Sequence, residues 1–172
     1  MVILEDTLEK DLARIIGFIG NCDSKSSIML GSTLTAVSLI LGLCGKEIIG
    51  ALMNSDAWIS ISTCIVLIIS LFMVVAGIAN VIMSIRARLD PSEYEDDSSV
   101  IFYGKIAALG LPQYRGAALA RDRESYLVGL TAQIHTCSII CQKKFEYYNR
   151  GLSYSVLGVV LLVLVAGISL FV

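Results

Sequence analysis

Three long stretches without a single charged residue dominate this chain of 172 residues. They run over residues 26–45, 57–85 and 151–172. The hydrocarbon core of a bilayer requires about 20 apolar helical residues, and a charge at its centre costs several kcal/mol. The pattern predicts an all-α membrane protein with about three transmembrane helices, and it excludes most soluble enzymes.

The distribution of basic residues predicts the orientation of these spans. Twelve of the thirteen Lys and Arg residues lie in residues 1–25 and 86–150, and only Lys46 lies between the first two spans. Because cytoplasmic loops carry the excess of basic residues, both basic segments are predicted to be cytoplasmic. The N-terminus is then inside, a short loop at 46–56 faces outward, and the C-terminus lies outside.

We interpret residues 1–172 as a single domain that begins with an amphipathic cytoplasmic helix in residues 1–25. One helical face is formed by apolar residues three or four positions apart; they are Leu4, Leu8, Leu12, Ile15 and Ile19. The small polar run Asn21–Ser27 favours a turn and a helix cap. We therefore expect the first helix to end there, just before the first span.

The cytoplasmic segment 86–150 is expected to be helical and to continue into the last span. An acidic loop follows the second span, a short apolar helix covers 100–110, and one helix runs from about Gly116 to the end of the chain. Leu127 to Tyr148 contains a coiled-coil-like seam with Lys144 as its polar member. One helix of about 50 residues, with Gly151 as a possible hinge, would then complete a helical bundle.

Small residues in the spans predict close helix contacts, since they let backbones approach one another. These residues are Gly31, Ser32, Thr33, Thr35, Ala76, Gly77, Ala79, Gly158 and Gly167. Asn80 is the one amide inside a span. We expect it to hydrogen-bond to a neighbouring helix, with a pore or oligomer contact as the alternative.

No motif of a known enzyme class is present, so we expect no catalysis and no cofactor. His135, Cys137 and Cys141 do not share the geometry of a metal site on one helix, and Asp96-Asp97 lies in the acidic loop. The net charge of −2 gives no basic field for nucleic acid. Three spans without a charged residue also do not resemble an alternating-access transporter.

Two polar clusters are candidate sites for a small anion. The first is Asp23-Ser24-Lys25-Ser26-Ser27, where backbone N–H groups at the start of a helix would attract negative charge. The second combines cations of the long helix with tyrosines for base stacking; its members are Arg121, Arg123, Gln133, Lys143, Lys144, Arg150, Tyr103, Tyr126, Tyr147 and Tyr148. Helix capping and the positive-inside bias are the alternative interpretations.

Several short motifs resemble one known family in their order and spacing relative to the spans. They are Asp23-x-Lys25-Ser26-Ser27, Ser99 to Ile106, Leu130-x-x-Gln133-Ile134 and Lys144-Phe145. Over roughly residues 12–165, the chain resembles the small transmembrane effector family of bacterial Pycsar anti-phage systems. The family's usual alanine after the lysine is Ser26 in this chain.

The resemblance implies an effector in the bacterial inner membrane that works beside a pyrimidine cyclase. Cyclic CMP or cyclic UMP would activate it, and the activated protein would impair the membrane and abort infection. The small residues of the membrane helices would let several copies assemble as a homo-oligomer. The predicted ligand-binding residues are Asp23, Lys25, Ser26, Tyr103, Gln133 and Lys144. Two alternatives stay open: a membrane scaffold or toxin-like protein that a protein partner activates at 127–148, and an effector for a different cyclic nucleotide.

Overall fold

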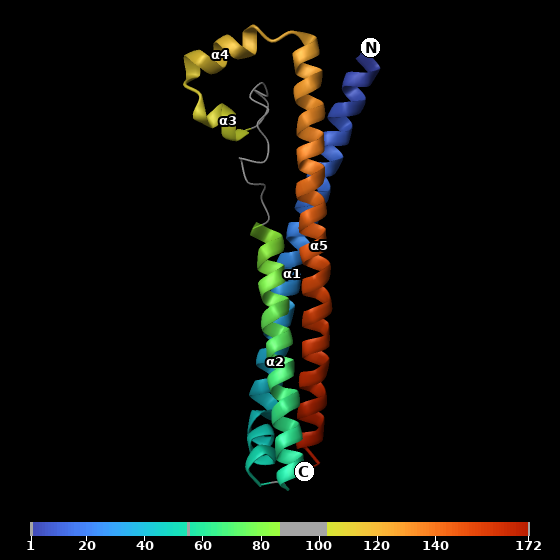
Figure 1. Ribbon diagram of the computed structural model, residues 1–172, viewed down its shortest axis with the longest axis vertical. Helices are drawn as coiled ribbons and strands as arrows, with labels where there is room; N and C mark the ends of the chain where they lie inside the picture. The colour runs from blue at the N-terminus through green and yellow to red at the C-terminus, as the bar shows by residue number, and fades with distance from the viewer. Residues whose placement is uncertain (1, 55, 87–102, 172) are drawn as a thin grey trace. The chain divides into compact units, whose positions relative to one another are not determined.

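The computed structural model describes residues 2–54, 56–86 and 103–171, with the side chains of 4–53, 56–86 and 106–171. These residues form five helices and no strand (Figure 1): α1 Val2–Asn54, α2 Ala57–Arg86, α3 Tyr103–Ala108, α4 Leu111–Leu119 and α5 Arg123–Ser169. Within α1, α2 and α5, the ranges Leu4–Met53, Ala57–Arg86 and Arg123–Ser169 are long and apolar enough to cross a membrane. The all-α fold with three membrane helices is thus confirmed.

Helix α1 is continuous over 53 residues, so the expected break at residues 21–27 is wrong. No Gly or Pro interrupts Asn21–Ser27, and Ser27 Oγ donates to the carbonyl of Asp23 at 2.9 Å. Such back-bonding lets a serine lie within a helix. The expected outer loop at 46–56 is also largely helical, because α1 continues to Asn54.

Helix α2 agrees with the predicted second span to within one residue. The continuous helix expected from Gly116 is instead interrupted between Leu119 and Arg123. The reason is local: the carboxylate of Asp122 accepts the backbone N–H of Ser125 at 2.9 Å and caps a new helix start. From there, α5 runs unbroken for 47 residues, as the sequence predicts for the long helix that contains the last span.

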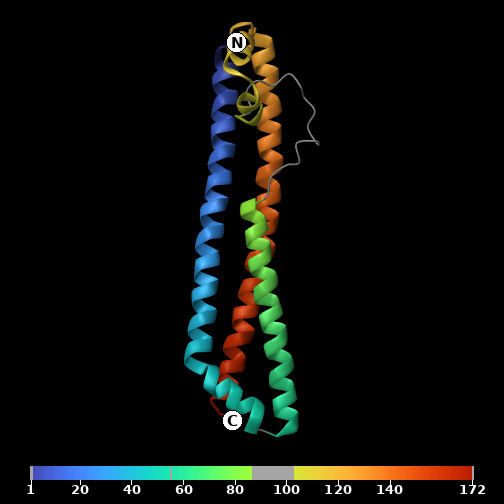
Figure 2. The ribbon, with the colours of Figure 1, turned by 90° about the vertical axis from the view of Figure 1, so that its left-hand side faces the viewer.

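The chain divides into two compact units, and α1 and α5 contribute to both. Unit 1 comprises Met1–Asn21 and Ala87–Lys143, and unit 2 comprises Cys22–Arg86 and Lys144–Val172. In unit 2, α1, α2 and α5 run side by side (Figure 2). Ile48, Val165 and Ala166 form an apolar core there.

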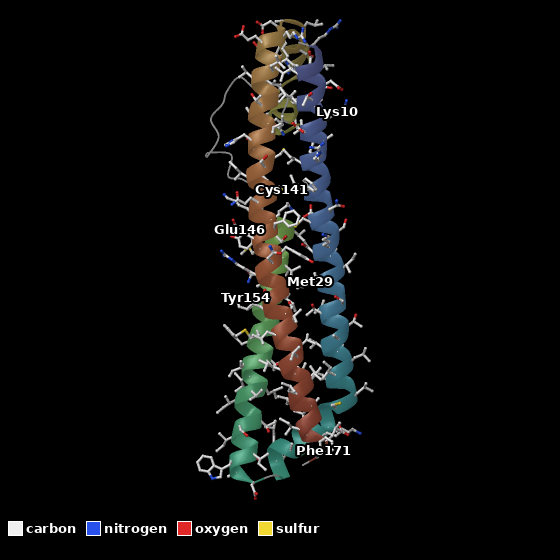
Figure 3. The ribbon with its side chains drawn as sticks, turned by 90° about the vertical axis from the view of Figure 1, so that its right-hand side faces the viewer. Lys10, Met29, Cys141, Glu146, Tyr154 and Phe171 are labelled. Carbon is white, nitrogen blue, oxygen red and sulfur yellow. The ribbon has the colours of Figure 1, made fainter. Side chains whose placement is uncertain are left out.

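Many large apolar side chains in unit 2 are exposed, as expected for helices that face lipid. Trp58 and Phe72 are among them. Phe171 is also exposed, whereas Met29 is buried between the helices (Figure 3). In a bilayer, this apolar surface is covered by acyl chains rather than by water. The outer surface of unit 2 therefore agrees with its assignment to the membrane.

The predicted seam of α5 is buried or half-buried along its length. Leu130 and Cys137 in unit 1 and Lys144 in unit 2 are buried, whereas Val128 and His135 on other faces are exposed. The spacing of three and four residues therefore identified the packed face of this helix correctly.

Close helix contacts form at Gly77 and Gly158, as predicted. A Cβ at Gly77 would meet the backbone N of Ser155 at 2.7 Å, and one at Gly158 would meet the backbone N of Val74 at 2.8 Å. Gly31 and Gly167 make no such contact, since nothing lies within 4 Å of their Cβ positions. Those two predictions are wrong for the described structure.

Two other predictions for the spans also need correction. Gly151 is not a hinge: it lies inside α5, and a Cβ there would meet Val81 Cγ2 at 2.7 Å and the carbonyl of Gly77 at 3.1 Å. Asn80 does not bond to a neighbouring helix, because its Nδ2 donates to the carbonyl of Ala76 at 2.8 Å within α2. A mid-helix amide can satisfy itself in this way without a partner helix.

Candidate functional site

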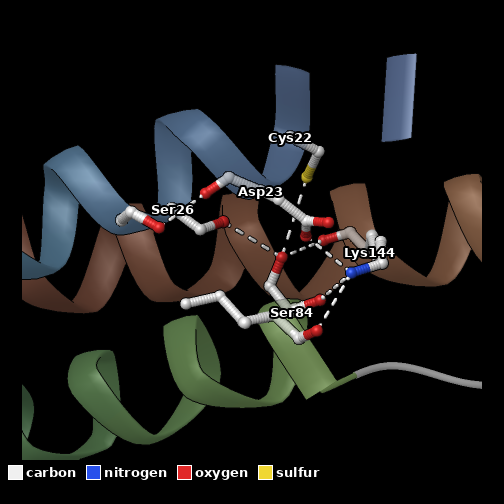
Figure 4. A network of polar contacts seen from close by, with 7 residues as sticks. Cys22, Asp23, Ser26, Ser84 and Lys144 are labelled. Carbon is white, nitrogen blue, oxygen red and sulfur yellow. Dashed lines mark hydrogen bonds and ion pairs between the residues drawn. The ribbon is translucent and has the colours of Figure 1, made fainter. Parts of the chain in front are cut away.

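A polar cluster joins the three helices of unit 2. It consists of Cys22, Asp23 and Ser26 from α1, Ser84 from α2 and Lys144 from α5 (Figure 4). We call these five residues the Lys144 cluster. In the sequence they lie close to the ends of the three charge-free stretches, so the cluster is positioned where apolar segments meet polar ones.

The ammonium group of Lys144 is buried and fully hydrogen-bonded. Its Nζ lies 2.6 Å from Asp23 Oδ1, 3.0 Å from the carbonyl of Ser84 and 3.1 Å from the carbonyl of Ile85. A lysine has three N–H donors, and each has an acceptor here. The Lys144 side chain is 6% exposed, but that of Asp23 is 41% exposed, so solvent reaches the pair from the carboxylate side.

The two carbonyls are available to Lys144 because α2 ends immediately after them, at Arg86. The last four carbonyls of a helix have no partner within the helix and carry a partial negative charge. Lys144 therefore caps the C-terminus of α2 from a neighbouring helix. This role explains why a cation occupies the seam of α5.

A chain of small polar groups completes the cluster. Ser84 Oγ donates to the carbonyl of Lys144 at 2.9 Å. Since a hydroxyl has one hydrogen and two lone pairs, Ser26 Oγ at 3.2 Å and Cys22 Sγ at 3.7 Å act as donors to Ser84. The exposed fractions of Ser26, Ser84 and Cys22 are all 0%, so each polar group is satisfied inside the protein.

Three of the six predicted site residues come together in this cluster: Asp23, Ser26 and Lys144. Lys25 does not join them, because it is exposed and two helical positions, about 200°, separate it from Asp23 around α1. Gln133 belongs to unit 1, where its Nε2 donates to Cys137 Sγ at 3.5 Å. Tyr103 begins α3, but its side chain lies outside the described residues.

The physical basis given for an anion site at residues 23–27 is wrong. Free N–H groups occur at the start of a helix, whereas residues 23–27 lie in the middle of α1. Backbone N–H groups in a helix interior are already bonded within the helix. Any anion site in this region must instead use side chains, and Lys144 is the buried cation available there.

Sequence reasoning missed Cys22 and Ser84. Both are small residues of kinds that often pack as ordinary buried groups, so neither type suggests a network. The sequence signal for Ser84 is its position as a small polar residue at the end of a long apolar span. For Cys22, the signal is the 3/4 spacing Ile19, Cys22, Ser26, which continues the packed face of α1.

Unit 1 contains a separate group of polar contacts between α1 and α5. Arg123 pairs with Glu5 at 2.8 Å, Tyr126 Oη donates to Glu9 at 2.7 Å, and Arg121 lies 5.5 Å from the centre of the Tyr126 ring. The hydrogen bond to Glu9 raises the pKa of Tyr126. The second predicted cluster is thus divided, with Arg121, Arg123 and Gln133 in unit 1 and Lys144 in unit 2.

Comparison with known proteins supports the resemblance seen in the motifs. The model of the Pycsar effector protein domain family matches residues 7–171. The chain belongs to the Pycsar effector family. One curated relative is the Pycsar effector protein GmPycTM of Gulbenkiania mobilis, which is 20% identical over 185 residues, covering 98% of this chain and 94% of the relative. No solved structure matches the chain.

Membership of the Pycsar effector family assigns the general role of the protein. It is an anti-phage effector located in a membrane, and its family is linked to a cyclase and to cyclic nucleotide signalling. The sequence-based assignment to this family is confirmed. The Lys144 cluster is the main buried polar feature that the described residues offer for this role.

Proposed function

We propose that the protein is a multi-pass effector of the bacterial inner membrane that cyclic CMP or cyclic UMP activates. The activated protein impairs the integrity of the membrane, and the infected cell stops growing before phage mature. Family membership and three apolar helices support this proposal. Because three helices are few for a pore, we propose that several copies assemble.

The observation that carries the proposal is the Lys144 cluster. One buried cation contacts α1 through Asp23 and the end of α2 through two carbonyls. A change at this cation alters the packing of all three membrane helices at once. A cyclic mononucleotide carries one negative charge, which a lysine ammonium can bind.

We propose that the nucleotide binds where Asp23, Ser26 and Lys144 meet, with its phosphodiester on the ammonium group of Lys144. Lys25 adds positive charge on the exposed side of the same turn of α1. The contributions of Tyr103 and Gln133 to ligand binding stay predictions from the sequence.

Dye release from liposomes tests this function directly. The purified full chain is reconstituted, and cyclic CMP, cyclic UMP and a cyclic dinucleotide are added one at a time. We expect release with one cyclic pyrimidine mononucleotide and none with the dinucleotide. Release with the dinucleotide alone would favour the alternative messenger, and no release with any nucleotide would contradict direct activation.

The scaffold alternative depends on the seam at 127–148 as a docking surface for another protein. In the described structure, Leu130 and Cys137 of this seam are already buried within unit 1. A partner protein would have to displace that packing before it could bind. The effector is therefore the function that we favour.

A further inference from the structure

In unit 2, helices α2 and α5 approach each other closely at glycine positions. At Gly77, a Cβ would collide with the backbone of Ser155, and at Gly158 it would collide with the backbone of Val74. A Cβ at Gly151 would lie 3.1 Å from the carbonyl of Gly77, a somewhat longer distance than at the other two glycines. Ser70 Oγ also donates to the carbonyl of Gly158 at 2.8 Å. In unit 2 these two helices form a closely packed pair.

The glycines of α1 make no such contacts. Nothing lies within 4 Å of the Cβ positions of Gly31, Gly42, Gly45 and Gly50. In unit 2, α1 packs through side chains such as Ile48 and through the Lys144 cluster. Contacts between side chains are repacked more readily than backbone contacts, so α1 is the helix that can shift against the α2–α5 pair.

Asp23 is the anionic partner of Lys144 in this arrangement. The other two acceptors on its Nζ are backbone carbonyls of α2. Replacing the carboxylate with another anion would therefore leave the capping of α2 intact. Of the three bonds of the Lys144 ammonium group, only the one to α1 would be lost, and α1 would then be held at the Lys144 cluster by the weaker contacts of Ser26 and Cys22 with Ser84.

We propose that the Asp23 carboxylate is a built-in anion that occupies the position of the messenger's phosphodiester on Lys144, and that its displacement frees α1 from the α2–α5 pair. This inference rests on the proposed function and adds its regulation. Without nucleotide, the Asp23 carboxylate binds Lys144 and keeps α1 against the α2–α5 pair. The messenger competes with Asp23 for Lys144.

The charges and the exposure of the pair favour this exchange. A phosphodiester and a carboxylate each carry one negative charge, so the charge balance around Lys144 is preserved. The approach is from the Asp23 side, where the side chain is 41% exposed. Once the phosphodiester is bound, the Asp23 carboxylate has lost its cationic partner, and the like charge of the phosphodiester repels it towards the solvent.

Cys22 is a native reporter of this movement. It lies on α1 beside Asp23, is 0% exposed, and its Sγ is 3.7 Å from Ser84 Oγ. The rate of its alkylation by N-ethylmaleimide can be measured by peptide mass spectrometry on the intact chain in lipid nanodiscs. Cys137, which is buried in unit 1, serves as an internal reference on α5.

The decisive variant is Asp23→Asn, which removes the charge and keeps the shape. We expect Cys22 to be alkylated about tenfold faster in this variant without any nucleotide, because local opening exposes the thiol. Cys137 should be unaffected. The matched control is Asp11→Asn, which breaks an exposed pair with Arg14 on the same helix and should leave both rates unchanged. An unchanged rate at Cys22 in Asp23→Asn overturns the proposal.

The second arm adds cyclic CMP or cyclic UMP to the native protein and measures binding by equilibrium dialysis beside alkylation and dye release. We expect tighter binding to Asp23→Asn than to the native chain, and faster alkylation of native Cys22 with the bound nucleotide. Binding and dye release with a protected Cys22 would overturn this inference alone. If no nucleotide binds and none causes dye release, both the proposed function and this inference are contradicted, whatever the alkylation rate of Cys22 in Asp23→Asn.

Discussion

At the scale of the residue, Lys144 shows how a cation can be stable in an apolar helix bundle. Its three hydrogen bonds replace the water that it would lose on burial. Two of them use carbonyls in the last turn of α2, which is described as far as Arg86. The burial of this lysine is therefore a consequence of where another helix ends.

Replacing Lys144 by Gln should destabilise the protein markedly. The change leaves Asp23 and two helix-terminal carbonyls without their cation, and breaking a buried pair typically costs about 3–5 kcal/mol. Because Asp23 is partly exposed, we expect about 2–3 kcal/mol, a reduction by solvent screening. Thermal unfolding in detergent measures the effect.

The control for this experiment is Arg150→Gln, which removes an exposed charge from the same helix. We expect a change within about 0.5 kcal/mol, as is usual at exposed positions. Equal destabilisation by the two substitutions would contradict the structural role assigned to Lys144.

At the scale of the element, the close approach of α2 and α5 determines which glycines are essential. Gly77→Ala places a methyl group against Ser155, whose backbone cannot move away without shifting α5. We expect a loss of about 1–3 kcal/mol, which is typical of overpacking. Gly31→Ala has open space around it, and alanine favours the helix over glycine by about 1 kcal/mol. Gly77→Ala should therefore lower the unfolding temperature, and Gly31→Ala should raise it. A shift of both temperatures in the same direction would contradict the assigned packing.

The start of α5 should depend on pH through Asp122. Hydrogen bonds from the side chain and the backbone N–H of Ser125 lower the pKa of this carboxyl below its usual value. Because the pKa of Asp122 is lower in the folded than in the unfolded chain, its cap stabilises the folded state fully at pH values above the unfolded pKa. This stabilisation is lost as the pH falls through the folded pKa. Amide hydrogen exchange of Ser125, corrected for its intrinsic rate, should accelerate in acid.

Asp122→Asn separates capping from charge. Asparagine is an equally good N-cap but does not titrate, so the protection of Ser125 should persist in acid. Asp122→Ala should remove the protection at every pH. If Asp122→Asn shows the same acid dependence as the native chain, another group is responsible.

At the scale of the whole molecule, three apolar helices that each cross the membrane are predicted to place the two ends of the chain on opposite sides. The bias of basic residues predicts that the N-terminus is cytoplasmic. A fluorescent protein fused to the N-terminus should therefore fluoresce, and alkaline phosphatase fused to the C-terminus should be active outside the inner membrane. A fluorescent C-terminal fusion would contradict three crossings in this orientation.

Much of the architecture could be predicted from the sequence because it follows from local physics. Charge-free stretches give membrane helices in any context, since the bilayer excludes charge. The 3/4 spacing along α5 identified its packed face, and glycine within a span predicted close contact at Gly77 and Gly158. The motif order identified the family. None of these inferences requires knowledge of which helix lies beside which.

Only the tertiary structure decided which polar residues meet. The continuity of α1 through Asn21–Ser27 placed Asp23 in a helix interior, where the helix-start argument does not apply. Lys144 and Asp23 lie 121 positions apart in the chain, and the partner of Lys144 on α2 is a helix end rather than a side-chain motif. Contacts between distant segments depend on helix register and on where each helix stops, and no short-range pattern encodes that.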